Sequence, residues 1–146
     1  MATTWTLTFD CAHATAQAEF WRLALDYVTA AAPKGFGSWR EWLIHHNVPE
    51  DEWQDVAAIE DPAGVGPRIS FLKVPEGKTA KNRIHLDLQA GGGRSEPIGV
   101  RWPRVLAKVE QLTAAGATVQ LTDFLDDGTP DHVLLADPES NEFCVV

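Results

Sequence analysis

Alternating apolar and polar residues predict the strands of this chain. Residues 5–12 (WTLTFDCA) place Leu7, Phe9 and Cys11 on one face of an extended segment and polar residues on the other. Since successive side chains of a strand point to opposite sides, one face can pack on a helix while the other stays open. The same reasoning predicts strands at residues 56–60, 68–74, 82–89, 117–121, 132–136 and 142–146, and a further short one at 27–32.

Apolar residues at helical spacing predict two long helices. In the first, the apolar positions within residues 20–27 follow the spacing i, i+3, i+4, i+7. The second is expected to have Pro103 in its first turn and Gly116 just past its end. The strand residues expected to pack under these helices are Leu7, Phe9, Ile84, Leu86, Leu88, Phe143 and Val145.

A shorter helix is predicted in residues 38–47 (SWREWLIHHN). Ser38 with Glu41 three residues later has the pattern of a capping box. Trp39 and Trp42 fall on one face of this helix, and a third tryptophan follows within fifteen residues of the first. Two interpretations are open: the segment packs on the sheet, or its indoles form a lid over a ligand, stacking on flat or cationic groups.

The order of elements repeats. An Asp-Pro pair precedes the last strand of each half, at Asp61 and at Asp137, 76 residues apart. The sequence therefore predicts an α+β fold of two tandem βαβββ modules, with the tryptophan-rich helix inserted in the first. We expect one domain of residues 1–146, with module one at about 1–76 and module two at about 77–146.

Composition narrows the classes of function. The formal net charge of −9 argues against nucleic acid, which needs clustered Lys and Arg. No segment approaches the apolar length of a membrane span, and the first thirty residues have no signal-peptide pattern, so we expect a cytoplasmic protein that does not bind membranes. The two cysteines, Cys11 and Cys144, do not form a CxxC pair.

Five stretches carry a resemblance to a known family. In this order along the chain they resemble the vicinal oxygen chelate superfamily (glyoxalase, bleomycin resistance protein and extradiol dioxygenase), in its glyoxalase-like branch. That resemblance implies curled mixed sheets around a cavity, helices on the outer faces, and a homodimer. The stretches are DCAHATAQAEFW (10–21), DPAGVGPRISF (61–71), KNRIHLDL (81–88), AAGATV (114–119) and DPESNEF (137–143).

Strand parity selects the candidate site. If the apolar faces pack under the helices, the opposite faces line the cavity that the resemblance implies. On those faces His85 is the candidate catalytic base or acid, next to carboxylates that would favour its protonated form. The expected ligand-binding residues are Asp10, Asp87, Glu142 and Cys144, with Trp39 and Trp42 at the mouth.

The resemblance also implies four metal-ligand positions, normally His, Gln or Glu. They fall on Thr6, on Arg68 or Ser70, on His85 and on Cys144. Only His85 matches, and an arginine repels a cation. We therefore predict no metal or other cofactor. A zinc site of His85, Cys144 and Glu142 remains an alternative.

The function that follows is binding of a small molecule by a glyoxalase-like protein with a degenerate metal site. The acidic charge and the tryptophans favour an aromatic or cationic ligand. One alternative is a metal-free or zinc-dependent enzyme of lyase or isomerase type that uses His85. Others are an antibiotic-sequestering protein of the bleomycin-resistance type and an interaction module without a ligand. The sequence leaves open whether any reaction is catalysed.

Overall fold

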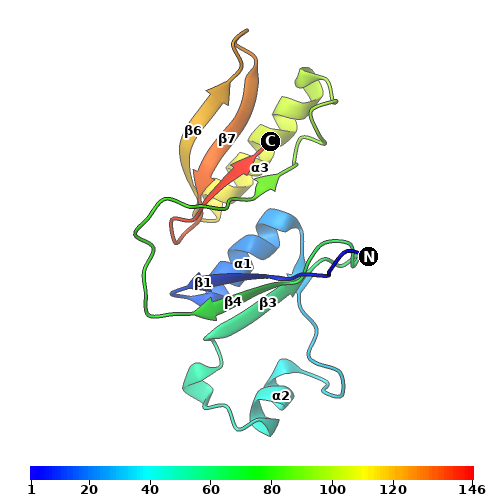
Figure 1. Ribbon diagram of the computed structural model, residues 1–146, viewed down its shortest axis with the longest axis vertical. Coiled ribbons are helices and arrows are strands. Elements are labelled where there is room, and N and C mark those ends of the chain that lie inside the picture. Colours follow the sequence, from blue (N-terminus) through cyan, green and yellow to red (C-terminus); the bar gives the residue numbers. More distant parts are fainter. The chain divides into compact units, whose positions relative to one another are not determined.

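The computed structural model describes residues 1–146, which form two compact units, residues 1–77 and 78–146 (Figure 1). Each unit holds one four-stranded mixed sheet that is not closed into a barrel. None of the helices is both long and apolar enough to cross a lipid bilayer. The predicted α+β architecture of two βαβββ modules is confirmed.

The first unit has the strand order β1-β4-β3-β2, with β1 parallel to β4 and the other pairs antiparallel. Between β2 and β3 the chain makes the predicted insertion, a helix and one 3₁₀ turn. The elements are β1 (Leu7–Cys11), α1 (Ala14–Leu25), β2 (Val28–Thr29), α2 (Trp39–His45), η1 (Glu50–Glu52), β3 (Val56–Glu60) and β4 (Ile69–Lys73).

The second unit repeats this arrangement without the insertion. Its strand order is β5-β8-β7-β6, with β5 parallel to β8 and the other pairs antiparallel. The match of order and direction between the two sheets identifies the halves as one repeated module. The elements are β5 (Asp87–Leu88), α3 (Ile98–Ala114), β6 (Thr118–Phe124), β7 (Pro130–Ala136) and β8 (Glu142–Val145).

Two details of the second unit differ from the sequence prediction. Helix α3 begins at Ile98, directly after Pro97, so Pro103 lies in its second turn and not in the first. Without an N–H, Pro103 leaves the carbonyl of Gly99 without its usual helical donor. Strand β5 is shorter than expected, and Ile84 is 78% exposed instead of packing under a helix, because regular pairing begins only at Asp87.

The remaining apolar faces pack as alternation predicts. In the first unit the Phe9 ring lies 4.9 Å from that of Trp21 on α1 and 5.4 Å from that of Phe71. In the second unit Phe143 and Leu135 are opposite one another and fully buried. Burying each such side chain contributes roughly 1.5–3 kcal/mol relative to exposure. The opposite faces carry polar residues such as Thr8 and Asp10 together with exposed apolar ones such as Val56 and Leu72.

The repeated Asp-Pro pair is a turn closed by a carboxylate. The Asp61 side chain accepts hydrogen bonds from the backbone N–H groups of Gly66, Ala63 and Val65, and these bonds lower the pKa of its carboxyl. The Asp137 side chain accepts in the same way from Glu139 and Asn141. An aspartate that binds the backbone ahead of it, followed by a proline with fixed φ, sets the direction of the next strand.

Candidate functional site

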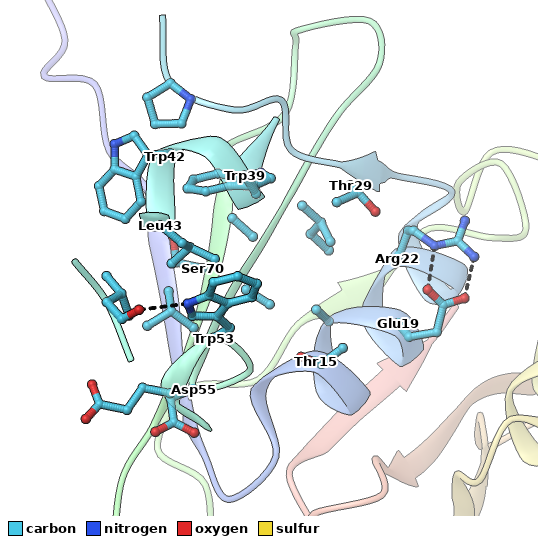
Figure 2. A pocket seen from close by; sticks show the side chains of 18 of the residues that line it. Thr15, Glu19, Arg22, Thr29, Trp39, Trp42, Leu43, Trp53, Asp55 and Ser70 are labelled. Atoms are coloured by element: carbon cyan, nitrogen blue, oxygen red, sulfur yellow. Dashed lines mark hydrogen bonds and ion pairs between the residues drawn. The ribbon is translucent and has the colours of Figure 1, made fainter. Parts of the chain in front are cut away.

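A pocket of about 740 Å³ lies within the first unit (Figure 2). The insertion forms one wall with the side chains of Trp39, Trp42, Leu43 and Trp53. The rest of the lining comes from other residues of the insertion, from α1, β2, β3 and β4, and from the residues directly before β3 and β4. A pocket of this size, lined mostly by apolar and aromatic side chains with a few polar groups, is typical of sites for small molecules.

The pocket exists because β2 is too short to cover β3. Strand β2 pairs only with Ile59 and Glu60, and beyond it the N–H of Ala30 donates to the carbonyl of Ala58 at 2.9 Å. Residues 56–58 therefore have a strand neighbour on the β4 side only. The insertion lies where a longer β2 would lie, and the pocket wraps around this edge of β3.

Two hydrogen bonds from indole groups fix the aromatic wall. Trp39 Nε1 donates to the carbonyl oxygen of Ala30 at 2.7 Å, and Trp53 Nε1 donates to that of Val48 at 2.9 Å. The Trp39 and Trp42 rings are in edge contact, with centroids 5.8 Å apart. With the polar N–H groups of two indoles satisfied, their rings are held as an apolar surface.

The capping box forms at the start of α2, where the Ser38 hydroxyl accepts from the N–H of Glu41 at 3.2 Å. The Glu41 carboxylate accepts a hydrogen bond of 2.8 Å from the backbone N–H of Gly37, whereas a capping box would use the N–H of Ser38. No residue of α2 is fully buried. Its half-buried tryptophans therefore line the pocket and do not belong to a closed core.

Cations of the protein already contact the aromatic wall. The Arg68 guanidinium lies 5.9 Å from the centre of the Trp39 ring, and that of Arg40 lies 5.7 Å from the centre of Trp53. Both distances are within the range of cation–π attraction. The third indole, Trp42, stacks on His46 with centroids 4.1 Å apart.

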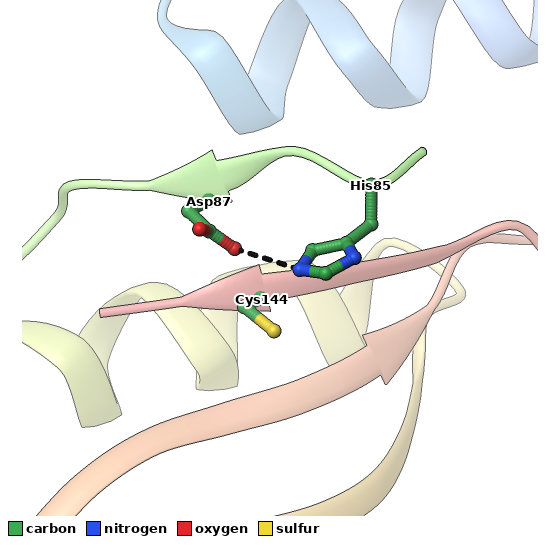
Figure 3. Close-up of side chains that lie close together, drawn as sticks. All are labelled: His85, Asp87 and Cys144. Carbon is green, nitrogen blue, oxygen red and sulfur yellow. Dashed lines mark ion pairs between the residues drawn. The ribbon is translucent and has the colours of Figure 1, made fainter. Parts of the chain in front are cut away.

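A second group of candidate site residues, His85, Asp87 and Cys144, lies on the second unit (Figure 3). His85 Nε2 is 3.2 Å from Asp87 Oδ1, so the expected pairing of His85 with a carboxylate is present. Asp87 and Cys144 are partners in the β5–β8 register. One donor atom from each of the three residues lies within 4.8 Å of the others. The alternation of side chains along the strands predicted that these three residues share the face opposite the helices, and the structure places them next to one another.

The Cys144 thiol is protonated at neutral pH. Burial raises its pKa to about 11, and the charge of Asp87 acts in the same direction. The thiolate is the nucleophilic form, so Cys144 is not an activated nucleophile in this environment. His85 is about half exposed and has a carboxylate to orient its ring, which is the arrangement of a general acid or base.

The donor atoms of this group do not fit a hard divalent metal. Mn²⁺ and Mg²⁺ prefer oxygen ligands, and here a buried thiol takes one of three positions. A soft thiolate, an imidazole and a carboxylate do suit zinc with one position open. Of the positions that the resemblance assigns to the first module, Thr6, Arg68 and Ser70 provide no metal ligand of His, Gln or Glu type.

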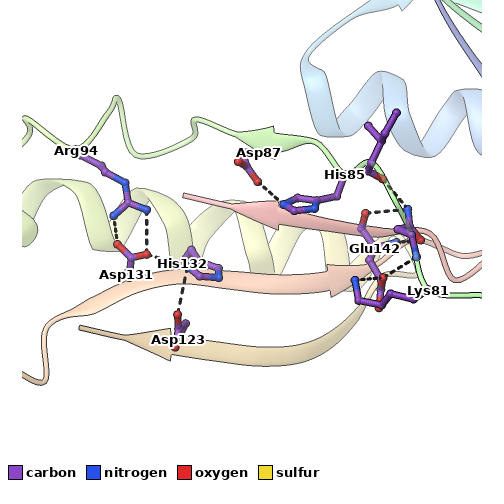
Figure 4. A network of polar contacts seen from close by, with 10 residues as sticks. Lys81, His85, Asp87, Arg94, Asp123, Asp131, His132 and Glu142 are labelled. Carbon is purple, nitrogen blue, oxygen red and sulfur yellow. Dashed lines mark hydrogen bonds and ion pairs between the residues drawn. The ribbon is translucent and has the colours of Figure 1, made fainter. Parts of the chain in front are cut away.

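The other expected site residues are placed differently. The Glu142 carboxylate forms an ion pair with Lys81 at 2.6 Å and accepts from the N–H of Asn82 at 3.3 Å (Figure 4). The hydrogen bond from Lys81 is the main cause of its lowered carboxyl pKa. Asp10 lies exposed on β1 of the first unit. The joint site that includes Asp10 and Glu142 stays a prediction.

Sequence reasoning missed several polar and aromatic contributors. Leu43 lines the pocket, and Arg68, considered above only as a metal-ligand position, contacts the Trp39 indole; Trp53, which was predicted only as part of a possible lid, also lines the pocket. Only one feature of the sequence indicated that an edge of β3 is open, namely the short apolar run at residues 27–32. A further cluster, also missed, joins Arg94, Asp131, His132 and Asp123 at the β6–β7 pair (Figure 4).

Comparison with known proteins gives one family. A family model described as a glyoxalase-like domain matches residues 6–146. A search of curated protein sequences finds no match.

Solved structures with this fold include an enzyme of the glyoxalase/bleomycin resistance protein/dioxygenase family from Burkholderia phytofirmans. It is 13% identical, with a TM-score of 0.59, and the match covers 96% of this chain and 94% of that one. The fosfomycin resistance protein FosX from Mesorhizobium loti is 8% identical, with a TM-score of 0.62 and coverage of 99% and 90%. A FosX mutant from Listeria monocytogenes, complexed with Mn(II) and 1S,2S-dihydroxypropylphosphonic acid, is 10% identical, with a TM-score of 0.61 and coverage of 99% and 89%.

Proposed function

The chain belongs to the glyoxalase-like domain family, within the vicinal oxygen chelate superfamily, and we propose that it binds a small aromatic molecule in the tryptophan-lined pocket of its first unit. The observation that carries this proposal is the aromatic wall beside the open edge of β3, around a volume of about 740 Å³. That volume suits a ligand with several fused or linked rings.

Binding without hard-metal chemistry fits the residues of both units. Two of the carboxylates in the pocket lining are held by cations, Glu19 by Arg22 and Asp55 by Lys73, and the donors of the second unit include a buried thiol. Sequestration of a compound needs only an enclosing apolar surface. An antibiotic-sequestering role is one form of this proposal, and fosfomycin resistance proteins are among the structures that share this fold.

A second candidate function is supported by the contact between His85 and Asp87. A histidine oriented by a carboxylate can abstract a proton from a small organic substrate, as in a lyase or isomerase. In this alternative His85 is catalytic and Asp87 positions it. A homodimer and a cytoplasmic location stay predictions.

Fluorescence titration with N-phenyl-1-naphthylamine, a neutral aromatic probe, tests the binding proposal. We expect saturable binding with one site per chain, weakened about tenfold or more in Trp42→Ala because a stacking face is lost. Trp5→Ala is the matched control, because Trp5 is 66% exposed and lies outside the pocket. Equal binding by the two variants would contradict the proposal.

A further inference from the structure

We propose that the tryptophan-lined pocket selects aromatic anions and that Arg68 binds the anionic group. The inference rests on the proposed function and adds the chemical class of the ligand: a flat apolar body bearing a carboxylate, sulfonate or similar acidic group. The sequence predicted an aromatic or a cationic ligand, and the inference replaces these two alternatives with an aromatic anion.

The position of Arg68 is fixed by the sheet. Its carbonyl accepts a hydrogen bond of 3.1 Å from the N–H of Leu7, at the point where β1 and β4 begin to pair. Arg68 and Ser70 are two residues apart, so both side chains lie on the same face, and both line the pocket. A guanidinium donates through a planar fork that fits an acidic group, and the Ser70 hydroxyl adds a further donor.

Arg68 is the basic residue of the lining that has no carboxylate partner. The other base, Arg22, donates from Nε to the Glu19 carboxylate at 2.9 Å. Among the lining acids, Asp55 pairs with Lys73 at 2.9 Å, which leaves Glu52 on the 3₁₀ turn without a basic partner. The charge that the pocket offers next to Trp39 is therefore positive.

The aromatic wall disfavours a cationic ligand for a separate reason. Cations prefer the faces of indoles, but Arg68 and Arg40 already lie over Trp39 and Trp53. A cationic ligand in the pocket would meet the guanidinium of Arg68, which lines it, and would lose affinity by repulsion. An aromatic anion packs its rings against the apolar lining and pairs its acidic group with Arg68, so its two parts meet complementary groups.

Two dyes with the same ring system test the inference. One is 8-anilinonaphthalene-1-sulfonate and the other is N-phenyl-1-naphthylamine, which lacks the sulfonate. We expect the wild-type chain to bind the sulfonate about tenfold more tightly, since hydrogen bonds between oppositely charged groups give about this factor. Arg68→Gln should remove this preference and leave the affinity for the neutral dye within about twofold.

Lys34→Gln is the matched control, because it removes the same charge from an exposed residue outside the lining. It should keep the preference for the sulfonate. If the neutral dye binds and the sulfonate binds no more tightly, or if the preference persists in Arg68→Gln, the anion inference is wrong while the binding proposal stands. If neither dye binds, the proposed function itself fails.

Discussion

The indole N–H of Trp39 donates a 2.7 Å hydrogen bond to the carbonyl oxygen of Ala30, whose own N–H donates to the carbonyl of Ala58 on β3. This short chain of contacts joins the insertion to the sheet at the place where β2 ends. The aromatic wall of the pocket is thus attached to the strand whose edge it covers. The geometry of the wall depends on the hydrogen bonds of the Trp39 and Trp53 indoles more than on burial, because α2 has no fully buried residue.

Replacing Trp39 with phenylalanine tests this attachment. Trp39→Phe keeps an aromatic face but leaves the Ala30 carbonyl without its indole donor, so we expect the free energy of unfolding to fall by about 1 kcal/mol. Urea denaturation monitored by circular dichroism measures it. Trp42→Phe is the control: the Trp42 indole N–H has no hydrogen-bond acceptor in the structure. Equal losses in the two variants would show that the hydrogen bond does not stabilise the insertion.

The free energy of unfolding at acid pH depends on the Asp131 carboxylate. Hydrogen bonds from Arg94 and then from His132 lower the pKa of this carboxyl to about 2. Because its pKa in the folded state lies below that in the unfolded state, its contribution is present above about pH 4 and is lost as the pH falls towards 2. Arg94→Gln should therefore move the acid unfolding midpoint up by about one pH unit.

Acid unfolding of the wild type and of Arg94→Gln, followed by circular dichroism at constant ionic strength, measures this shift of the midpoint. Arg83→Gln removes the same charge from an exposed residue and serves as the control. An unchanged midpoint in Arg94→Gln would mean that the ion pair with Asp131 does not contribute to stability.

The Cys144 thiol should react slowly. With its pKa raised to about 11 by burial and by Asp87, its thiolate fraction at pH 7.5 is about a hundredfold below that of a free cysteine. We expect alkylation by iodoacetamide in the Cys11→Ala background to be slower by at least this factor than in the unfolded chain. Alkylation as fast as for an exposed thiol would make Cys144 a candidate nucleophile.

Several residues show how much of the fold could be predicted from the sequence. Alternation placed Phe9, Leu88 and Phe143 under the helices and Asp87 with Cys144 on the opposite face, because a strand has a period of two whatever its partner. The prediction was wrong at Ile84, which lies in an alternating stretch of sequence but comes before the residues that pair with β8, and is exposed.

The pocket could not be predicted in the same way. It arises from the difference in length between β2 and β3, and from the hydrogen bond that Trp39 makes to a residue nine positions earlier. Propensity and periodicity report neither property, because both depend on where a strand stops pairing. The ion pair between Glu142 and Lys81 likewise joins residues 61 positions apart, which no local pattern indicates.

Metal content follows from the donor atoms of the second unit. We expect purified protein to hold no stoichiometric Mn²⁺, since Mn²⁺ prefers oxygen ligands and this group offers one carboxylate beside an imidazole and a thiol. Elemental analysis of protein prepared without chelators measures this, with His85→Ala as the comparison. One ion per chain in the wild type that is lost in His85→Ala would show that the donor argument is wrong and that the His85 group is a metal centre.

The central claim is that the ligand lies among the tryptophans of the first unit, and the indole N–H resonances of the six tryptophans test it most directly. A ¹H–¹⁵N spectrum recorded during titration with N-phenyl-1-naphthylamine should show the signals of Trp39, Trp42 and Trp53 shifting together and saturating at one ligand per chain. Those of Trp5 and Trp102, which do not line the pocket, should stay unchanged. Saturable shifts confined to Trp5 or Trp102, or to the backbone around His85 and Cys144, would contradict this placement of the site.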